Sequence, residues 1–552
     1  MTARAAAPGA ARRAPRVAGP GAGQAGRSPA WAAPAALAAV HLLLALLAFD
    51  PTPYTGGDNA AYMTLARSLL ERGRFLEMWD PASPPHILYP PGFPGLLALA
   101  MLLGIDSWVG LKLVIIAAST AAVVFSYLWL VRRWGGRVAL GIGILLASSP
   151  GIVGLSHSIL SDVPFWMLTM AALWGFARLE AGERGGAAVA VAATVLAYFT
   201  RSAGLPLALA AGAWLALGRR RRALAALAAT LLPLAFLWWL RGRGVAGADY
   251  MDSFWLVNPY RPELGRIGAA DLAARMWANN GLYMRVYLPV LLFGEGGGAL
   301  AFLGIGVALL ALAGWALEVR RPGPGELFLP LYIGLLYVWP EVWAGDRFLL
   351  PAVPLILGYA ARTLAAIVGR LRVARPAPVG AAAVGLVILL GLPAQLDAAR
   401  QGMTCTAAYR LGSAYPCLPP AWQDFFSIAE WARDNLPGDA VILSRKPRLF
   451  YALSGHRGRI YPRNPDPAEL VREAREAGAR YVILDLLDAQ SIRYLIPALT
   501  HRPAAFCIVH TLGPERVTVF GVMPGADTIP DQAGDAADAR FAVCPAGYAP
   551  SR

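Results

Sequence analysis

The sequence predicts a polytopic α-helical membrane protein with about eleven transmembrane spans, followed by a small extracytoplasmic α/β domain. Three observations predict this fold class. Hydrophobic residues make up 57% of the 552 residues and the mean hydropathy is +0.49, above the values of soluble domains. These residues gather in long blocks with little charge, such as 142–155 and 303–317. Arginines mark alternate short loops, and all four cysteines follow the last apolar block.

Each long apolar block is expected to be helical, because lipid offers no hydrogen-bond partners to an open backbone. The tail at 1–30 is basic and rich in Ala, Pro and Gly, so we expect it to be disordered and cytoplasmic. We interpret the run 31–49 as a retained first helix of a transmembrane domain at 31–396, not as a cleaved signal. The expected spans are roughly 31–49, 107–131, 138–157, 163–177, 186–200, 202–217, 223–240, 299–318, 326–343, 348–368 and 379–396.

The charge of the short loops predicts the orientation of these spans in a plasma (inner) membrane. Five short loops carry arginine and alternate with loops that are nearly free of it, so the positive-inside rule places them and the N-terminus in the cytoplasm. The five are Arg132/Arg133/Arg137, Arg178/Arg184, Arg219–Arg222, Arg320/Arg321 and Arg370/Arg372/Arg375. The long loops 50–106 and 241–298 are then extracytoplasmic. This topology explains the net charge of +15 without nucleic acid as a partner.

The region 397–552 is expected to be the extracytoplasmic domain, because an odd number of spans places it outside. Helical patterns at 424–436 and 467–477 alternate with apolar strand patterns at 440–444, 481–485 and 517–522. Such alternation is typical of an α/β domain with a largely parallel sheet.

All four cysteines, Cys405, Cys417, Cys507 and Cys544, lie in this domain. Four cysteines allow three pairings, of which Cys405–Cys417 with Cys507–Cys544 is locally the simplest. Disulfides persist only in an oxidising compartment, which agrees with a domain outside the cytoplasm. Four reduced, buried thiols are the alternative.

An acidic residue, Asp58, follows the first span directly and begins a helical run at 60–72 that includes Tyr62. Asp is a good helix N-cap, because its carboxylate accepts backbone N–H bonds. It is also a candidate base for an acceptor hydroxyl or amine. The two interpretations are compatible, since a cap also fixes the carboxylate.

The same loop ends in the stiff segment 89–94, Tyr-Pro-Pro-Gly-Phe-Pro, which is suited to redirect the chain into a helix at 95–103. Tyr89 begins this segment, and the preceding His86 is a weak candidate for the site. A second acid, Asp162, lies in a short outer turn before Val-Pro, which also favours a helix start. Asp162 could alternatively orient an acceptor or hold a divalent cation.

Arg201 and Arg347 are the only basic residues in the short outer loops. A guanidinium binds phosphate through two parallel hydrogen bonds, so an anionic lipid headgroup is a natural partner. The alternatives are snorkelling to the interface, or for Arg347 a local pair with Asp346. Lys112, near the outer start of the second span, is a weaker candidate. No Walker A loop, zinc cluster, Gly-x-Ser-x-Gly elbow or Rossmann fingerprint stands out, so any energy source must come with the substrate.

These motifs, in this order, resemble the GT-C superfamily of membrane glycosyltransferases over roughly residues 31–370. The closest resemblance is to family 39, with the protein O-mannosyltransferases, the aminoarabinose transferases of lipid A and the RgtA/B/C/D-like group. The shared pattern has an acid after the first span, Tyr and Ala at helical spacing, a Pro-Pro element, a second-loop acid, a Thr-Arg and an Arg-x-Leu-x-Pro element. The matching residues are Asp58, Tyr62, Ala66, Tyr89-Pro90-Pro91-Gly92, Asp162, Thr200-Arg201 and Arg347-Phe348-Leu349-Leu350-Pro351.

The resemblance implies a GT-C-like fold and sugar transfer from a polyprenyl-phosphate donor to an extracytoplasmic glycan, lipid or protein, by one inverting displacement. The implied roles are catalysis by Asp58 and Asp162, donor-phosphate binding by Arg201 and Arg347, and substrate positioning by Tyr62 and Tyr89. Outside the matched motifs, Lys112 is added as a donor-phosphate candidate, and His86 and Asp346 as substrate-positioning candidates. Two departures stand out. The family often has Asp-Glu where this chain has Asp58-Asn59. The aminoarabinose enzymes have Lys before Pro-Pro where this chain has Tyr89, which disfavours an aminoarabinose donor.

Two other functions compete with the transferase: a transporter or flippase of lipid-linked glycans, and a non-catalytic scaffold for envelope glycan assembly. Transporters usually place ionisable groups near the bilayer midplane and show paired repeats. Here the informative charges are expected at one membrane surface. The sequence does not indicate the sugar or the acceptor.

Overall fold

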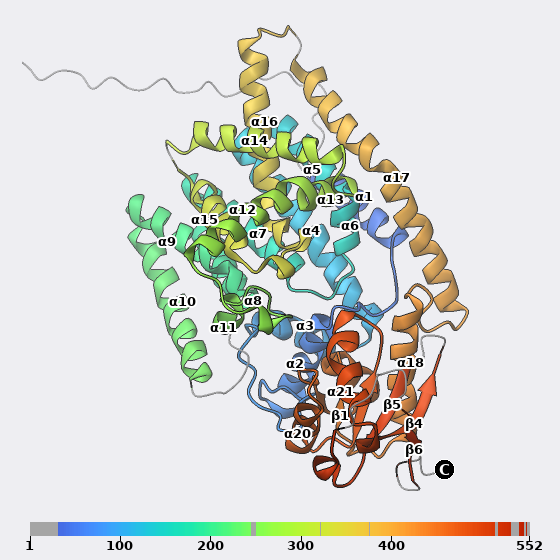
Figure 1. Cartoon of the computed structure of the whole chain (residues 1–552). Helices are drawn as coiled ribbons and strands as arrows, with labels where there is room; N and C mark the ends of the chain where they lie inside the picture. The colour runs from blue at the N-terminus through green and yellow to red at the C-terminus, as the bar shows by residue number, and fades with distance from the viewer. Residues whose placement is uncertain are drawn as a thin grey trace, which may run out of the picture.

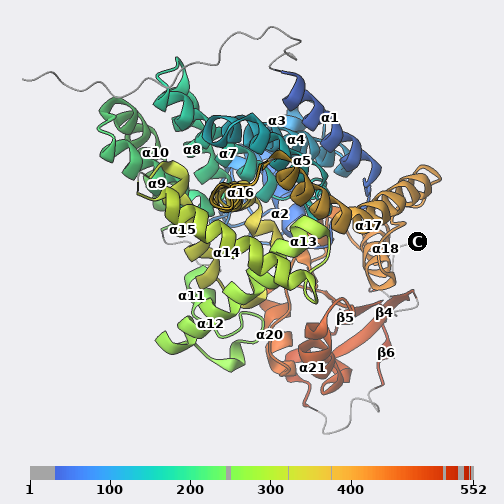
Figure 2. The ribbon, with the colours of Figure 1, turned by 90° about the horizontal axis from the view of Figure 1, so that it is seen from above.

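The computed structural model describes residues 31–243, 250–320, 322–374, 376–513, 517–531, 540–545 and 548. The expected N-terminal tail and the loop residues Arg321 and Arg375 lie outside the described residues. A large helical body carries a smaller C-terminal domain on one end, drawn orange and red in Figure 1. Figure 1 shows α2 (Asp58–Arg72) next to the C-terminal domain, and Figure 2 shows that domain to one side of the helical body.

One or two apolar helices occupy most of each expected span, and the expected number of about eleven crossings stays a prediction. Five helices in the described part are long and apolar enough to cross a membrane, so the chain is an integral membrane protein: Trp108–Trp134, Arg221–Gly242, Leu300–Glu318, Asp346–Arg370 and Ala377–Arg410. The helices of the body are α1 (Ala32–Leu47), α4 (Trp108–Trp134), α5 (Gly136–Ser148), α6 (Pro150–Leu155), α7 (Asp162–Glu180), α8 (Gly186–Thr200), α9 (Leu205–Leu217), α10 (Arg221–Gly242), α14 (Leu300–Glu318), α15 (Pro324–Val338), α16 (Val353–Arg370) and α17 (Pro376–Arg410).

Two expected spans have different bounds in the structure. The span expected at 138–157 is divided into α5 and α6, because Pro150 has no N–H and begins a new helix after Ser149. The span expected at 379–396 continues as α17 to Arg410, so the expected domain boundary at 397 falls inside a helix. The continuation is rich in alanine and other good helix formers, which keep the helix regular beyond the apolar run.

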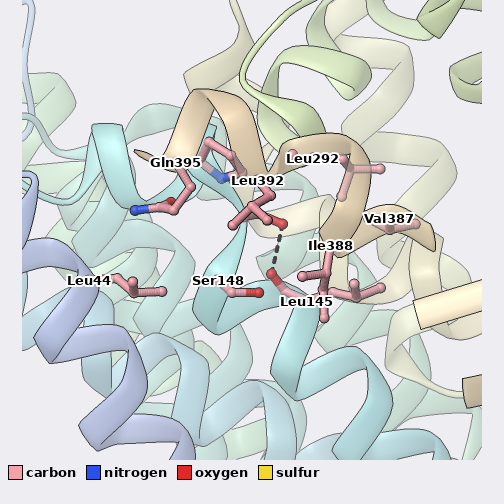
Figure 3. Close-up of a pocket in the computed structure, with 11 residues that line it drawn as sticks. Leu44, Leu145, Ser148, Leu292, Val387, Ile388, Leu392 and Gln395 are labelled. Carbon is pink, nitrogen blue, oxygen red and sulfur yellow. Dashed lines mark hydrogen bonds between the residues drawn. The ribbon is translucent and has the colours of Figure 1, made fainter. Parts of the chain in front are cut away.

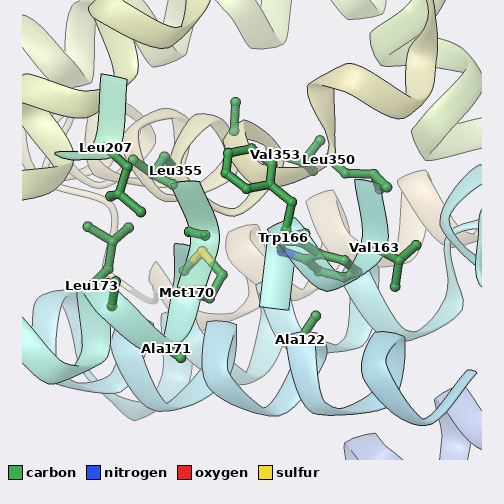
Figure 4. Close-up of a cluster of buried hydrophobic side chains, with 14 of the residues drawn as sticks. Ala122, Val163, Trp166, Met170, Ala171, Leu173, Leu207, Leu350, Val353 and Leu355 are labelled. Carbon is green, nitrogen blue, oxygen red and sulfur yellow. The ribbon is translucent and has the colours of Figure 1, made fainter. Parts of the chain in front are cut away.

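The core of the body lies where α7 packs against α4, α8 and the 3₁₀ segment η5 (Asp346–Ala352). Trp166 and Met170 of α7 are fully buried, and they lie among side chains from α4, α9 and α16 (Figure 4). Because the lipid-facing helices are apolar outside as well as inside, close packing and not solvent exclusion holds this centre together.

The two long loops are also helical. The first loop contains α2 and α3 (Gly92–Leu102). The second contains α11 (Tyr250–Phe254), α12 (Ala269–Leu282), the π-turn η3 (Tyr283–Tyr287) and α13 (Leu288–Phe293). A 3₁₀ segment, η5 (Asp346–Ala352), leads into α16.

The C-terminal domain is an α/β domain, as predicted. Its elements are α18 (Pro420–Asn435), β1 (Ile442–Leu443), α19 (Pro447–Ser454), β2 (Gly458–Arg459), α20 (Pro467–Ala477), β3 (Tyr481–Leu484), β4 (Phe506–Leu512), β5 (Val517–Val522) and β6 (Ala542–Val543). The expected bounds of α20 and β5 agree with the structure. Both of the locally simplest disulfides are present, Cys405–Cys417 and Cys507–Cys544.

The prediction of a largely parallel sheet was wrong, because the sheet is mixed. Its strand order is β2-β1-β3-β5-β4-β6. The strand β1 is parallel to β2 and β3, whereas β5 is antiparallel to both β3 and β4. The segment of β4 was not predicted as a strand, and its hairpin with β5 introduces the antiparallel pairings, whereas β6 pairs with β4 in parallel.

The C-terminal domain packs directly on the first long loop. Ala60 of α2 belongs to the same buried cluster as Phe425 and Phe450. The backbone N–H of Gly458 donates to the carbonyl of Trp79 at 2.7 Å, and Arg459 pairs with Asp80 at 2.8 Å. In the same contact α19 packs on α2, whose first residue is Asp58.

Candidate functional site

Asp58 lies at the start of α2, and Gly57 before it is the N-cap. Gly57 has φ +87°, in the left-handed region that favours glycine, and this turn directs Asp58 away from the helix axis. The carboxylate makes no capping hydrogen bond, so the cap interpretation of Asp58 was wrong. It accepts instead from Arg347 Nη2 at 3.2 Å and from the Tyr89 hydroxyl at 2.9 Å.

Asp162 is likewise the first residue of α7 and not its cap, which is Ser161. Its Oδ1 is 2.7 Å from Arg201 Nη1, and its Oδ2 is 4.0 Å from Arg347 Nη1. Asp58, Arg347, Asp162 and Arg201 therefore form one row of alternating charges, which we call the charge row. Four separate segments supply it: the starts of α2, α7 and η5, and the end of α8.

The backbone holds these segments close together. A Cβ on Gly92 would lie 2.5 Å from the carbonyl oxygen of Phe199, so only glycine fits where α3 meets the end of α8. This close approach brings the Tyr-Pro-Pro-Gly segment against Thr200-Arg201. The ring of Phe348 lies under both guanidinium groups, 5.1 Å from Arg201 and 4.8 Å from Arg347, which favours two neighbouring cations.

Tyr62 and Tyr89 frame the charge row. The Tyr62 ring contacts the Tyr89 ring at 4.8 Å, and its hydroxyl lies 3.0 Å from Ser161 Oγ. Ser161 Oγ also accepts from Arg201 Nη1 at 3.0 Å. Burial raises the pKa of the Tyr62 hydroxyl, so Tyr62 serves as a neutral hydrogen-bonding group.

The two carboxylates of the charge row differ in exposure. The Asp58 side chain is 31% exposed and the Asp162 side chain 4% exposed. Burial opposes ionisation of Asp58, yet Arg347, Arg448 and the Tyr89 hydroxyl hold its pKa below the usual value. Asp58 is therefore an accessible carboxylate, whereas Asp162 is enclosed by its two arginines.

Besides the two framing tyrosines, three predicted site residues lie outside the charge row: Lys112, Asp346 and His86. The Lys112 ammonium donates to the carbonyls of Asp50 and Thr52, at 2.6 and 2.5 Å, and so ties down the end of the first span. Two of the three N–H donors of Lys112 are thus engaged by the backbone, and in the described part of the chain it contacts no member of the charge row. Its role in phosphate binding stays a prediction. The Asp346 carboxylate accepts from the backbone N–H of Arg347 at 2.8 Å.

His86 is buried behind the Pro-Pro segment. Its Nδ1 is 2.7 Å from Glu77 Oε1, and its Nε2 accepts from the backbone N–H of Tyr89 at 2.9 Å. Burial lowers the pKa of His86 despite Glu77, which favours the neutral ring that this pattern requires. His86 thus fixes the backbone of Tyr89 without touching the charge row.

The sequence analysis missed Arg448, which belongs to α19 of the C-terminal domain. Its Nη1 donates to the Tyr89 hydroxyl at 2.9 Å. No motif marks this arginine, because its role depends on the docking of a separate domain.

The described residues contain no group of three or more His, Cys, Asp or Glu side chains that could hold a metal ion. A cavity of about 130 Å³ lies between α1, α5, α13 and α17, lined by residues such as Leu44, Leu145, Leu292 and Gln395 (Figure 3). Its described lining includes no member of the charge row.

Comparisons with known proteins support the fold. No family model and no curated protein sequence matches the chain. Among solved structures, the oligosaccharyltransferase AglB from Archaeoglobus fulgidus, in complex with an inhibitory peptide and a dolichol-phosphate, matches with a TM-score of 0.54 and 13% identity over 89% of this chain and 74% of AglB. The structure of ArnT from Cupriavidus metallidurans bound to undecaprenyl phosphate matches with a TM-score of 0.51 and 15% identity over 89% of this chain and 98% of ArnT.

The chain is similar in structure to GT-C membrane glycosyltransferases. The fold is therefore GT-C-like, with a mostly helical body and a C-terminal mixed-sheet domain, whereas the expected number of about eleven spans stays a prediction. At these identities the likeness shows the fold alone. The roles of the residues in the charge row depend on their geometry in this chain.

Proposed function

We propose that the chain is a glycosyltransferase that moves a sugar from a polyprenyl-phosphate donor to an extracytoplasmic glycan, lipid or protein. The observation that carries this proposal is the charge row, in which two arginines lie beside an accessible carboxylate. The structural neighbours AglB and ArnT, whose structures hold dolichol-phosphate and undecaprenyl phosphate, support the donor class.

In the proposed reaction Arg347 and Arg201 bind the donor phosphate, since guanidinium groups form charge-assisted hydrogen bonds with its oxygens. The acceptor oxygen attacks the anomeric carbon as the bond from that carbon to the phosphate oxygen breaks. The bonding electrons leave with polyprenyl phosphate, and Asp58 takes the acceptor proton. One displacement inverts the anomeric centre. The activated sugar–phosphate bond removes the need for a nucleotide.

Asp162 acts on the two arginines in this scheme. Its burial keeps it away from an acceptor, and its contacts with Arg201 and Arg347 hold both guanidinium groups beside each other. We therefore assign Asp162 to positioning and Asp58 to proton removal.

We place the site on the outer side of the membrane, with the N-terminus cytoplasmic and the C-terminal domain extracytoplasmic. The arginine pattern of the short loops supports this orientation. The two disulfides support it independently, because they persist in an oxidising compartment.

The experiment is deletion of the gene followed by mass spectrometry of envelope lipids, glycans and glycoproteins. We expect the deletion to lower the mass of one envelope product by one sugar. Expression of the unaltered chain should restore that sugar. Asp58→Asn should fail to restore it, although it inserts and accumulates normally. Asp434→Asn, which changes an exposed aspartate paired with Arg433, is the matched control and should restore it. Full restoration by Asp58→Asn would remove Asp58 from the mechanism.

A further inference from the structure

Arg448 reaches the charge row from the C-terminal domain. It lies on α19, which packs on α2, and its guanidinium lies 5.1 Å from the Trp79 ring and 5.6 Å from the Tyr89 ring. Its Nη1 donates to the Tyr89 hydroxyl oxygen at 2.9 Å. Two aromatic rings and one hydrogen bond therefore fix this cation.

This contact fixes the direction of the next hydrogen bond. A guanidinium can only donate, so the Tyr89 oxygen acts as the acceptor for Arg448. The single hydroxyl proton of Tyr89 is then directed to Asp58 Oδ1, at 2.9 Å. Arg347 contacts the other oxygen of the same carboxylate, Oδ2. Both oxygens of the Asp58 carboxylate are thus held. Arg347 of the helical body contacts Oδ2 directly, and Arg448 of the C-terminal domain acts on Oδ1 through Tyr89.

Arg448 also differs from the arginines of the charge row in its charge balance. Arg201 and Arg347 each have a carboxylate partner within 4.0 Å. Within the part of the chain that the structure describes, Arg448 makes no such ion pair. It therefore adds positive charge to a row in which carboxylates and arginines otherwise match in number.

We propose that the C-terminal domain completes the catalytic site, and that Arg448 is a positioning residue that acts through Tyr89 to hold the Asp58 carboxylate toward the acceptor. This inference rests on the proposed function. The influence of Arg448 and Tyr89 on the pKa of Asp58, which both hold down, agrees with it. The titratable or charged groups that face Asp58 are Arg347, Arg448, Lys446, Tyr54, Tyr62 and Tyr89.

The test measures the ionisation of Asp58 without a substrate. The full chain in detergent is treated with a hydrophobic carbodiimide, which reacts with protonated carboxyl groups, and labelling of Asp58 is followed against pH by peptide mass spectrometry. In Arg448→Met the midpoint of labelling should move to higher pH by about one unit, because a nearby cation no longer favours the carboxylate. Tyr89→Phe should move it in the same direction, and Arg448→Lys should partly restore it.

Arg459→Met is the matched control. Arg459 lies in the same domain contact and pairs with Asp80, but it touches no residue of the charge row. It should leave the labelling midpoint of Asp58 unchanged, and thermal unfolding of each variant shows that the chain is folded. An unshifted midpoint in folded Arg448→Met would overturn the proposal.

Transfer in cells separates this inference from the proposed function. Arg448→Met should reduce restoration of the sugar-bearing product at least tenfold, whereas Arg459→Met should restore it. If the midpoint shifts but Arg448→Met restores the product fully, Arg448 has no role in the reaction and the inference fails. If Asp58→Asn restores the product, the proposed function of Asp58 fails, whatever the labelling shows.

Discussion

Arg347 and Asp58 form an ion pair at 3.2 Å although 289 positions separate them in the sequence. Arg347 follows a span late in the helical body, whereas Asp58 follows the first span. Their contact therefore shows that segments from the beginning and from the later part of the helical body lie next to each other at the site. A phosphate that enters the site would compete with the Asp58 carboxylate for this guanidinium, and its arrival would free Asp58 to accept a proton.

Replacing Arg347 should weaken binding of the lipid product, undecaprenyl phosphate. Arg347→Met removes a charged donor from the proposed phosphate site, a loss of about 1.5–3 kcal/mol that corresponds to roughly a 10- to 100-fold weaker Kd. Native mass spectrometry of the detergent-solubilised chain with added undecaprenyl phosphate measures it. Arg370→Met, at the exposed far end of α16, should bind as the unaltered chain does. Equal affinities for Arg347→Met and Arg370→Met would contradict phosphate binding by Arg347.

Replacing Asp162 should destabilise the chain, because it removes the buried carboxylate that pairs with the half-buried Arg201. Removing one partner of a buried pair costs about 3–5 kcal/mol, whereas removing both partners costs much less. We therefore expect Asp162→Asn to lower the thermal unfolding temperature clearly. The double variant Asp162→Asn/Arg201→Met should recover part of that loss, although it should not restore sugar transfer. Additive losses in the double variant would show that Asp162 and Arg201 do not depend on each other.

The helical body could largely be predicted from the sequence, because a long apolar run has one stable backbone conformation in lipid. The sheet was less predictable. The segment 506–512 reads FCIVHTL, without strict alternation of polar and apolar residues, and it was not predicted as a strand. The β4–β5 hairpin and the mixed sheet were therefore not predicted either. The strand β1 is only two residues long, so its extended conformation depends on pairing with β2 and β3 and not on its own sequence.

The candidate site could be predicted in part, because few charged residues are expected next to the ends of the spans on the outer side of the membrane. That rarity singled out Asp58, Asp162, Arg201 and Arg347, which the structure brings together. It could not show that backbone carbonyls engage Lys112, because such contacts leave no trace in the sequence. Arg448 was missed because arginine is common in the C-terminal domain, so its position there carried no signal.

The stability of the C-terminal domain should fall as the pH rises between about 4 and 6, because of Asp485. Burial raises the pKa of this carboxyl to about 6, so the folded chain holds a proton there that the unfolded chain releases near pH 4. Below both values the group contributes nothing, and above pH 6 its ionisation costs about 3 kcal/mol. Asp485→Asn can keep the hydrogen bonds from Ser491 and the Leu487 N–H, and should flatten this dependence. The change in thermal unfolding temperature between pH 4.5 and pH 7.5 measures this pH dependence. An equal change for Asp485→Asn and for the unaltered chain would contradict the raised pKa of Asp485.

The two disulfides predict both the stability and the location of the C-terminal domain. Cys405–Cys417 closes a loop with a sequence separation of 12, and Cys507–Cys544 one of 37, so each should stabilise the domain by about 3–4 kcal/mol. Intact cells treated with a membrane-impermeant maleimide should show no labelling of the four cysteines unless a reductant is added first. With reductant, labelling should appear without lysis, because the proposed topology places the domain outside. A serine variant of Cys507 should expose Cys544 to the reagent in untreated cells, while Cys405 and Cys417 stay protected. Labelling only after lysis would reverse the proposed orientation, and labelling of the intact chain without reductant would favour four reduced thiols.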